Sequence, residues 1–124
     1  MKIILFIIPL LLFSCSVKHQ GKKCPDYIKG KASFYGKKFH RKKTASGEIY
    51  NMYRYTAAHR YLPFGTVLLV KNLKNGKSVK VVINDRGPFI RGRVLDLSYT
   101  AAKKIDMLRE GVVPIIAKVL RCGR

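Results

Sequence analysis

The chain has 124 residues, of which 26 are Lys or Arg and only six are Asp or Glu, so its formal net charge is +20. This length allows one small domain. Apolar residues make up 48% of the chain, and the ten Gly and five Pro are few, which excludes a disordered polycation, a collagen-like chain and a low-complexity linker and leaves a folded basic domain.

The first 14 residues have the pattern of an export signal. Lys2 precedes an apolar run from Ile3 to Phe13, which is shorter than the roughly 20 apolar residues that a membrane-spanning helix needs. The sequence Leu12-Phe13-Ser14-Cys15 is similar to a bacterial lipobox, in which the cysteine is acylated. We therefore expect residues 1–14 to be a lipoprotein signal peptide and Cys15 to carry lipid. An ordinary signal peptide with a cysteine nearby by chance is the alternative.

Residues 15–25 are polar and basic, and they predict a lipidated tether ahead of a domain over residues 26–124. The lipid would attach the protein to the membrane of the cell envelope, and Ser16 after the cysteine favours the outer membrane, with the domain facing the periplasm. A protein in this position meets the cell wall and anionic lipid first. Because its Lys and Arg are scattered in short clusters, we expect no nucleic-acid partner.

Lipidation of Cys15 leaves two cysteines, Cys24 and Cys122, which bracket the predicted domain. In an oxidising periplasm this pair could form a disulfide that ties the two ends together. Two free thiols are the alternative. No Cys or His pair has the spacing of metal ligands, so we expect no metal site and no cofactor.

Apolar and β-branched runs predict five strands, over residues 27–35, 66–73, 78–84, 93–97 and 112–120. The second and third are joined by Lys74-Asn75-Gly76-Lys77, whose Asn-Gly pair favours a tight hairpin. Ser98 is expected to cap a helix that presents Ala101, Ala102, Ile105 and Leu108 on one face and ends at Gly111. Many short strands with one helix predict a mainly β fold, a small closed barrel without exposed edges.

Six short blocks between Gly30 and Leu120 carry a resemblance to a known family. They are Gly30-Lys31-Ala32-Ser33-Phe34-Tyr35-Gly36, Thr44-Ala45-Ser46-Gly47-Glu48, Thr56-Ala57-Ala58-His59-Arg60, Leu62-Pro63-Phe64-Gly65-Thr66, Asn84-Asp85-Arg86-Gly87-Pro88-Phe89 and Arg93-Val94-Leu95-Asp96-Leu97-Ser98. In order and spacing they resemble the rare lipoprotein A (RlpA) family. The resemblance implies a six-stranded double-psi β-barrel with one or two short helices.

The resemblance also implies a peptidoglycan lytic transglycosylase, which cleaves the bond between N-acetylmuramic acid and N-acetylglucosamine and leaves 1,6-anhydro ends. Its partners would be peptidoglycan glycan strands and division-site proteins, in cell wall remodelling and daughter-cell separation. A carboxyl group must protonate the glycosidic oxygen and then help the muramic 6-hydroxyl attack its own anomeric carbon, and one group can do both. A non-catalytic, expansin-like peptidoglycan-binding lipoprotein is the alternative.

Three of the six acids, Glu48, Asp85 and Asp96, lie inside the family blocks. Asp85 ends an apolar strand ahead of a sharp Arg86-Gly87-Pro88 turn that could present its carboxyl group at a groove; alternatively it bonds only its own turn. Asp96 lies within an apolar strand, where an unpaired carboxylate would be costly, so it needs a partner or a catalytic purpose. The alternative for Asp96 is to cap the following helix.

The resemblance assigns catalysis to Asp85, Asp96, Glu48 and His59, although a lone histidine is otherwise a packed or surface residue. It assigns substrate binding to Asn51, Tyr35, Ser46 and Arg86, although core packing is the alternative for the Tyr35 ring. By strand alternation, Arg86 should point away from Asp85. Active relatives tend to carry an aspartate three residues after the glutamate, where this chain has Asn51. An asparagine can bond sugar but cannot transfer a proton at neutral pH, which leaves binding intact and puts catalysis in question.

Overall fold

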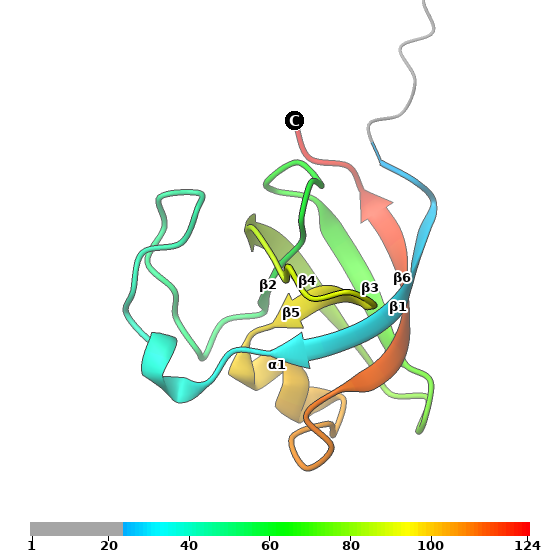
Figure 1. Ribbon diagram of the computed structural model, residues 1–124. Helices are drawn as coiled ribbons and strands as arrows, with labels where there is room; N and C mark the ends of the chain where they lie inside the picture. The colour runs from blue at the N-terminus through cyan, green and yellow to red at the C-terminus, as the bar shows by residue number, and fades with distance from the viewer. Residues whose placement is uncertain (1–23) are drawn as a thin grey trace, which may run out of the picture.

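The computed structural model describes residues 24–124, which form one closed β-barrel (Figure 1). The strands follow one another around the barrel in the order β1-β5-β2-β4-β3-β6. The elements are β1 (Tyr27–Phe34), η2 (Lys37–Phe39), β2 (Thr56–Ala58), β3 (Val67–Asn72), β4 (Ser78–Asp85), β5 (Arg93–Leu97), α1 (Tyr99–Lys104) and β6 (Val113–Arg121). The expected signal peptide and the lipidated Cys15 lie outside the described residues.

The barrel interior is filled by every second side chain along each strand, because side chains alternate between the inside and the outside of the barrel. On β3 and β4 these are Leu68, Val70, Val79, Val81 and Ile83, all buried, while their neighbours face outward. Helix α1 adds Ala101 and Ala102 to the same core cluster. Because the barrel closes and its core is complete within residues 24–124, this segment is a folding unit in its own right. No helix in it is long and apolar enough to span a membrane.

Strand β2 is the element that the sequence did not predict. It has only three residues, two of them alanine, so it shows neither a β-branched run nor a clear alternation. In the barrel it pairs in parallel with β4 and antiparallel with β5. A second parallel pair joins β1 to β5, so β2 and β5 bring the carboxyl ends of β1 and β4 toward each other. This arrangement positions the candidate site.

The β3–β4 hairpin is confirmed, with Gly76 at a positive φ of 78°. The predicted helix is confirmed at its start, where the Ser98 side chain accepts a hydrogen bond from the Ala101 N–H. Its predicted end at Gly111 is wrong. The helix stops at Lys104, because Asp106 adopts a left-handed φ of 54° and the Met107 N–H bonds back to the Ala102 carbonyl.

Candidate active site

Asp85 ends β4 with its carboxylate held by three donors. The Tyr35 hydroxyl donates to Oδ2, and the backbone N–H groups of Ala45 and Arg86 donate to Oδ1 at 2.8 and 2.9 Å. The bond from Arg86 is the local turn contact that the sequence raised as an alternative. The other two come from distant segments, so Asp85 also joins β1 and the loop after it to β4.

Asp96 lies on β5, which is separated from β4 by strand β2, and its environment differs from that of Asp85. Its partner across the β1–β5 pair is Ser33, whose hydroxyl donates to Asp96 Oδ1. Burial is the main cause that raises the pKa of Asp96; nearby Asp85 raises it further, while Ser33 and Arg93 oppose the change. The alternative that Asp96 caps the helix is excluded, because Ser98 is the N-cap residue.

Strand β2 brings the two aspartates together. Ala58 is the register partner of Asp85 on one side and of Asp96 on the other. The two carboxyl groups therefore belong to one site, although they are distant in sequence. The Asp85 carboxyl group accepts from three donors, whereas Asp96 is half-buried with a single hydroxyl partner, so the two acids have different environments.

Tyr35 follows β1 and turns its hydroxyl onto Asp85. Its ring packs between Phe39 and Tyr50, with centroids 5.8 and 4.8 Å away. Burial and the Asp85 carboxylate raise the pKa of the Tyr35 hydroxyl, so it stays protonated and remains a donor. Tyr50 is itself buried, and its hydroxyl accepts from the Tyr99 N–H. The Phe39 and Tyr50 rings thus hold the Tyr35 ring in the position from which its hydroxyl contacts Asp85.

His59 is buried just beyond β2 and shapes the loop that follows. Its Nδ1 accepts hydrogen bonds from the Tyr61 and Leu62 N–H groups, both at 3.1 Å. These bonds place the proton of the neutral ring on Nε2. Burial first, and then Arg60 and Arg86, lower the pKa of His59 to about 4. At neutral pH His59 is therefore uncharged, and its Nδ1 stabilises the loop by accepting these two hydrogen bonds.

Arg86 holds the same loop from the other side. Its Nη1 donates to the carbonyls of Leu62 at 2.8 Å and His59 at 3.2 Å, and the guanidinium lies 3.9 Å over the Phe64 ring. These contacts occupy the side chain that the family resemblance assigned to substrate. They give Arg86 a supporting role in the loop instead.

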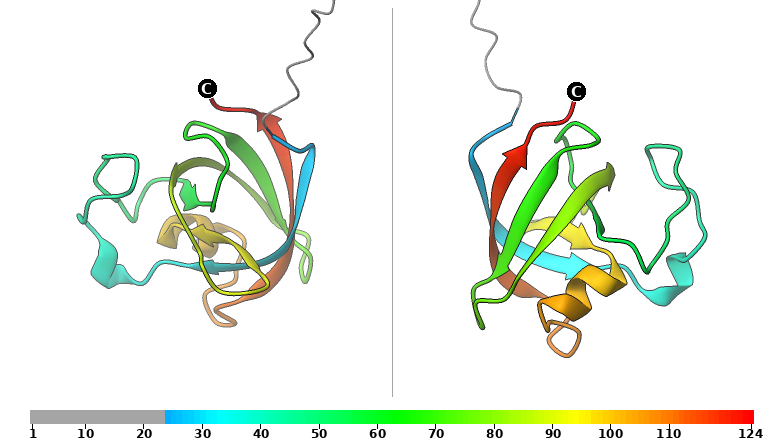
Figure 2. Two further views of the ribbon diagram at one scale, coloured as in Figure 1. Left: turned by 45° about the horizontal axis from the view of Figure 1, so that its top comes forward. Right: turned by 180° about the vertical axis from the view of Figure 1, so that it is seen from behind.

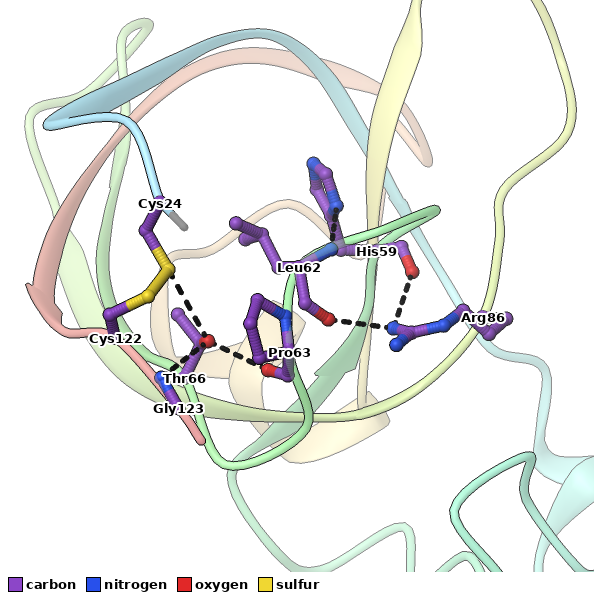
Figure 3. Close-up of a disulfide and its surroundings, with 8 residues drawn as sticks. All are labelled: Cys24, His59, Leu62, Pro63, Thr66, Arg86, Cys122 and Gly123. Carbon is purple, nitrogen blue, oxygen red and sulfur yellow. Dashed lines mark hydrogen bonds between the residues drawn. A yellow bond between two sulfur atoms is a disulfide. The ribbon is translucent and has the colours of Figure 1, made fainter. Parts of the chain in front are cut away.

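The Cys24–Cys122 disulfide is formed, and it contacts the far end of this loop (Figure 3). Cys24 Sγ lies 3.8 Å from Thr66 Oγ1, which donates to the Pro63 carbonyl and accepts from the Gly123 N–H. Figure 3 shows the disulfide on one side of the loop and Arg86 on the other. The loop is thus held at both ends. Its first residue, His59, donates its N–H to the Asp85 carbonyl, so the loop also contacts the end of β4.

The remaining predicted site residues lie on the long loop between η2 and β2. Glu48 is exposed, with Oε1 3.4 Å from the Ser46 hydroxyl, while Asn51 accepts from the Tyr53 N–H through its Oδ1. Both line an open cavity of about 600 Å³ together with His40, Arg41, Ile49, Tyr50, Tyr53 and Arg54. Ser46 lies next to both groups, because its hydroxyl lies 3.4 Å from the cavity residue Glu48 and the N–H of its neighbour Ala45 donates to Asp85.

Ser33 is the site residue that the sequence analysis missed. It lies two positions before Tyr35, and this spacing places both side chains on one side of an extended chain. Two hydroxyl residues at that spacing, next to two aspartates in other blocks, were the available signal. Within residues 24–124, no three His, Cys, Asp or Glu side chains gather closely enough to hold a metal ion.

Comparisons with known proteins identify close relatives of this barrel. A family described as "Lytic transglycolase" matches residues 27–117. A probable endolytic peptidoglycan transglycosylase RlpA of Aquifex aeolicus is 68% identical over 102 residues, which cover 82% of this chain and 45% of that protein. The endolytic peptidoglycan transglycosylase RlpA of Helicobacter pylori J99 is 53% identical over 94 residues, or 76% of this chain and 30% of that one. This chain thus spans less than half the length of either relative.

Solved structures share the fold at lower sequence identity. A Streptomyces papain inhibitor superposes with a TM-score of 0.62 at 24% identity, covering 77% of this chain and 94% of the inhibitor. An expansin of Clavibacter michiganensis, crystallised as a mutant in complex with cellohexaose, superposes with the same TM-score at 21% identity, covering 77% of this chain and 50% of the expansin.

Proposed function

The chain belongs to the rare lipoprotein A (RlpA) family of double-psi β-barrel proteins, and on this premise we propose that it is a peptidoglycan lytic transglycosylase. The observation that carries the proposal is the pair of unlike aspartates, Asp85 on β4 and Asp96 on β5, which are both register partners of Ala58 on the intervening strand β2. The relatives named endolytic peptidoglycan transglycosylases support the substrate class. The substrate bond is the one between N-acetylmuramic acid and N-acetylglucosamine.

Asp96 is the proton donor in this mechanism. Its burial and the nearby Asp85 charge favour the protonated form, so it can give a proton to the glycosidic oxygen as the bond to the muramic anomeric carbon breaks. Asp85, whose carboxyl group is oriented by three hydrogen-bond donors, has the role of stabilising the positive charge that develops on that carbon.

The second half of the reaction returns the proton. Asp96, now a carboxylate, takes the proton of the muramic 6-hydroxyl while that oxygen bonds to the anomeric carbon and closes the 1,6-anhydro ring. No water is consumed, and both aspartates recover their starting states. Glu48 and Asn51, which line the open cavity, hold the neighbouring sugar, and the Ser46 hydroxyl positions Glu48. His59 and Arg86 act as positioning residues through the loop that they hold.

The product distinguishes this function from hydrolysis and from binding alone. Digestion of purified wall sacculi should release fragments with anhydromuramic ends, lighter than hydrolysis products by one water, as mass spectrometry can show. Asn51 favours one other outcome, because it cannot transfer a proton. If the wild-type protein binds sacculi and releases nothing while Asn51→Asp releases anhydromuramic fragments, the chain is a binding protein that has lost a family acid.

We further propose that Cys15 carries lipid and anchors the protein to the outer membrane, where it takes part in daughter-cell separation with division-site proteins. The support is the lipobox-like Leu12-Phe13-Ser14-Cys15 and the following Ser16. Labelled palmitate should enter the wild-type protein and not Cys15→Ala. Equal labelling of both proteins would exclude this anchor, and membrane fractionation identifies which membrane holds the protein.

A further inference from the structure

The outer wall of the barrel carries a regular alternation of lysine and apolar side chains. Strand register places Tyr27 opposite Lys118, Lys118 opposite Leu69, and Leu69 opposite Lys80, in one row across four strands. The next row runs through Lys29, Ile116, Lys71 and Ser78. Each of these lysines therefore has only non-basic neighbours, both across the strands within its row and along its own strand in the other row. We call these eight positions on β1, β6, β3 and β4 the lysine face.

The lysine face points to solvent along its whole extent. Its four lysines are exposed, Tyr27 is 56% exposed, and Leu69 and Ile116 are half-buried, while the residues between them on each strand fill the core. None of its eight residues is acidic. The charge of the face is thus not balanced within it, and aliphatic and aromatic surface lies between the ammonium groups.

The face lies away from the loop that carries the cavity residues. In Figures 1 and 2, strands β1, β6 and β3 form one side of the barrel, and the loop between η2 and β2 projects from the other in all three views. The lysine face also includes the N-terminal end of the barrel, since Tyr27 is the first residue of β1. A partner bound to the lysine face therefore leaves the loop between η2 and β2 uncovered.

We propose that the lysine face docks on an anionic phospholipid bilayer. Lysine side chains beside apolar residues can lay their stems along the surface and reach the headgroup phosphates, while the apolar residues meet the boundary of the acyl region. Each lysine near an anionic membrane strengthens binding by roughly fivefold. A soluble polyanion would be held by the lysines alone and would gain little from Tyr27, Leu69 and Ile116, so the interleaved apolar surface favours the bilayer.

The position of the face suits a protein tethered through its N-terminus. The ten residues from Cys15 to Cys24 make nine Cα–Cα steps, which reach at most about 30 Å when fully extended. A tether of this length keeps the domain near the bilayer but does not orient it. Docking through the lysine face would orient it, with the acid pair and the cavity loop turned toward the cell wall.

The test uses residues 24–124, which fold as a unit and lack any anchor, with vesicles of phosphatidylglycerol and phosphatidylcholine. The face variant is Lys71→Gln, Lys80→Gln and Lys118→Gln. The matched control removes three exposed lysines elsewhere, as Lys42→Gln, Lys103→Gln and Lys104→Gln. Co-sedimentation should show that the face variant binds phosphatidylglycerol vesicles at least about tenfold more weakly than the control variant does, with salt weakening the wild type. Equal losses in the two variants would show that net charge alone acts, and would overturn the proposal.

A second pair of variants tests the apolar half of the face. Tyr27→Ser should weaken vesicle binding a few-fold, whereas Tyr53→Ser, which changes an exposed tyrosine on the cavity loop, should not. If Tyr27→Ser binds vesicles as the wild type does, and soluble polyphosphate binds as tightly as the vesicles, the face recognises polyanions and the bilayer proposal is wrong. Circular dichroism confirms that each variant is folded. Sacculus digestion is measured separately, so failure of the proposed activity and failure of docking remain distinguishable.

Discussion

Tyr35 and Asp85, 50 positions apart, are joined by a hydrogen bond from the tyrosine hydroxyl to Oδ2 of the carboxylate. The bond links the end of β1 to the end of β4, and the raised pKa of Tyr35 keeps the hydroxyl a donor at neutral pH. Tyr35 was expected from the family resemblance to bind substrate. Its hydroxyl is instead committed to one of the two acids, which makes it a positioning residue.

Tyr35→Phe should therefore lower kcat for sacculus digestion by about tenfold and leave KM almost unchanged. The variant keeps the ring between Phe39 and Tyr50 and removes one of three donors to Asp85. The control is Tyr27→Phe, at an exposed tyrosine on β1 outside the cavity. A rise in KM with unchanged kcat would instead support the substrate contact that the family resemblance implied.

The raised pKa of Asp96 predicts a pH dependence of both turnover and stability. Turnover should fall as pH rises through that pKa, because the acid must begin protonated. Stability should fall over the same range, because the folded protein binds a proton there that the unfolded chain has already lost. Asp96→Asn should lose this dependence of the unfolding free energy on pH, and Asp106→Asn, on the exposed turn after α1, should keep it. Identical pH profiles of denaturation for the wild type and Asp96→Asn would contradict the assignment.

His59 has a pKa lowered to about 4, and the sign of its effect is reversed. The unfolded chain binds the proton first, so stability from this residue is complete above about pH 6.5 and is lost as pH falls toward 4. His59→Asn should weaken this acid dependence, since an amide oxygen can accept in place of Nδ1 without titrating. His40→Asn is the control, because His40 Nδ1 also accepts a backbone N–H, that of Met52. Ring titration of His59 near pH 6.5 by NMR would exclude this account.

The disulfide should be the main stabiliser of the loop that Thr66 ends. Cys24 and Cys122 are 98 positions apart, and closing a loop of that length stabilises a small exported domain by about 2–5 kcal/mol. The double variant Cys24→Ala, Cys122→Ala should unfold at correspondingly lower denaturant, and reductant should lower the Tm of the wild type alone. If the oxidised wild type and the double variant unfold at the same denaturant concentration, the bond contributes nothing to the loop.

The sequence predicts the strands that carry long alternating or β-branched runs, such as those flanking Gly76, because side-chain burial on one face is written directly into residue order. It does not predict β2, whose three residues owe their extended form to pairing with β4 and β5 on both sides. Helix α1 is predicted at Ser98, where a local hydrogen bond starts it. Its end depends on the backbone of Asp106, which has no comparable local signal.

The candidate site divides in the same way. Asp85 and Asp96 are found from sequence because carboxyl groups in apolar strands are costly and few. Their partners are not, because the Ser33–Asp96 pair depends on the parallel register of β1 and β5. The buried, loop-shaping state of His59 likewise depends on N–H groups of the next turn, so its residue type alone indicates a proton carrier that the geometry does not favour.

The two conservative variants Asp85→Asn and Asp96→Asn, assayed for release of anhydromuramic fragments from sacculi, test the central claim most directly. Both keep side-chain size and remove the titrating proton or the charge. Loss of general acid catalysis costs on the order of 10² to 10⁴ in rate, so we expect Asp96→Asn to lose turnover by that factor while it still binds sacculi, and Glu48→Gln to lose less. Release by both aspartate variants at the wild-type rate would show that neither aspartate carries the proton, and the proposed mechanism would be wrong.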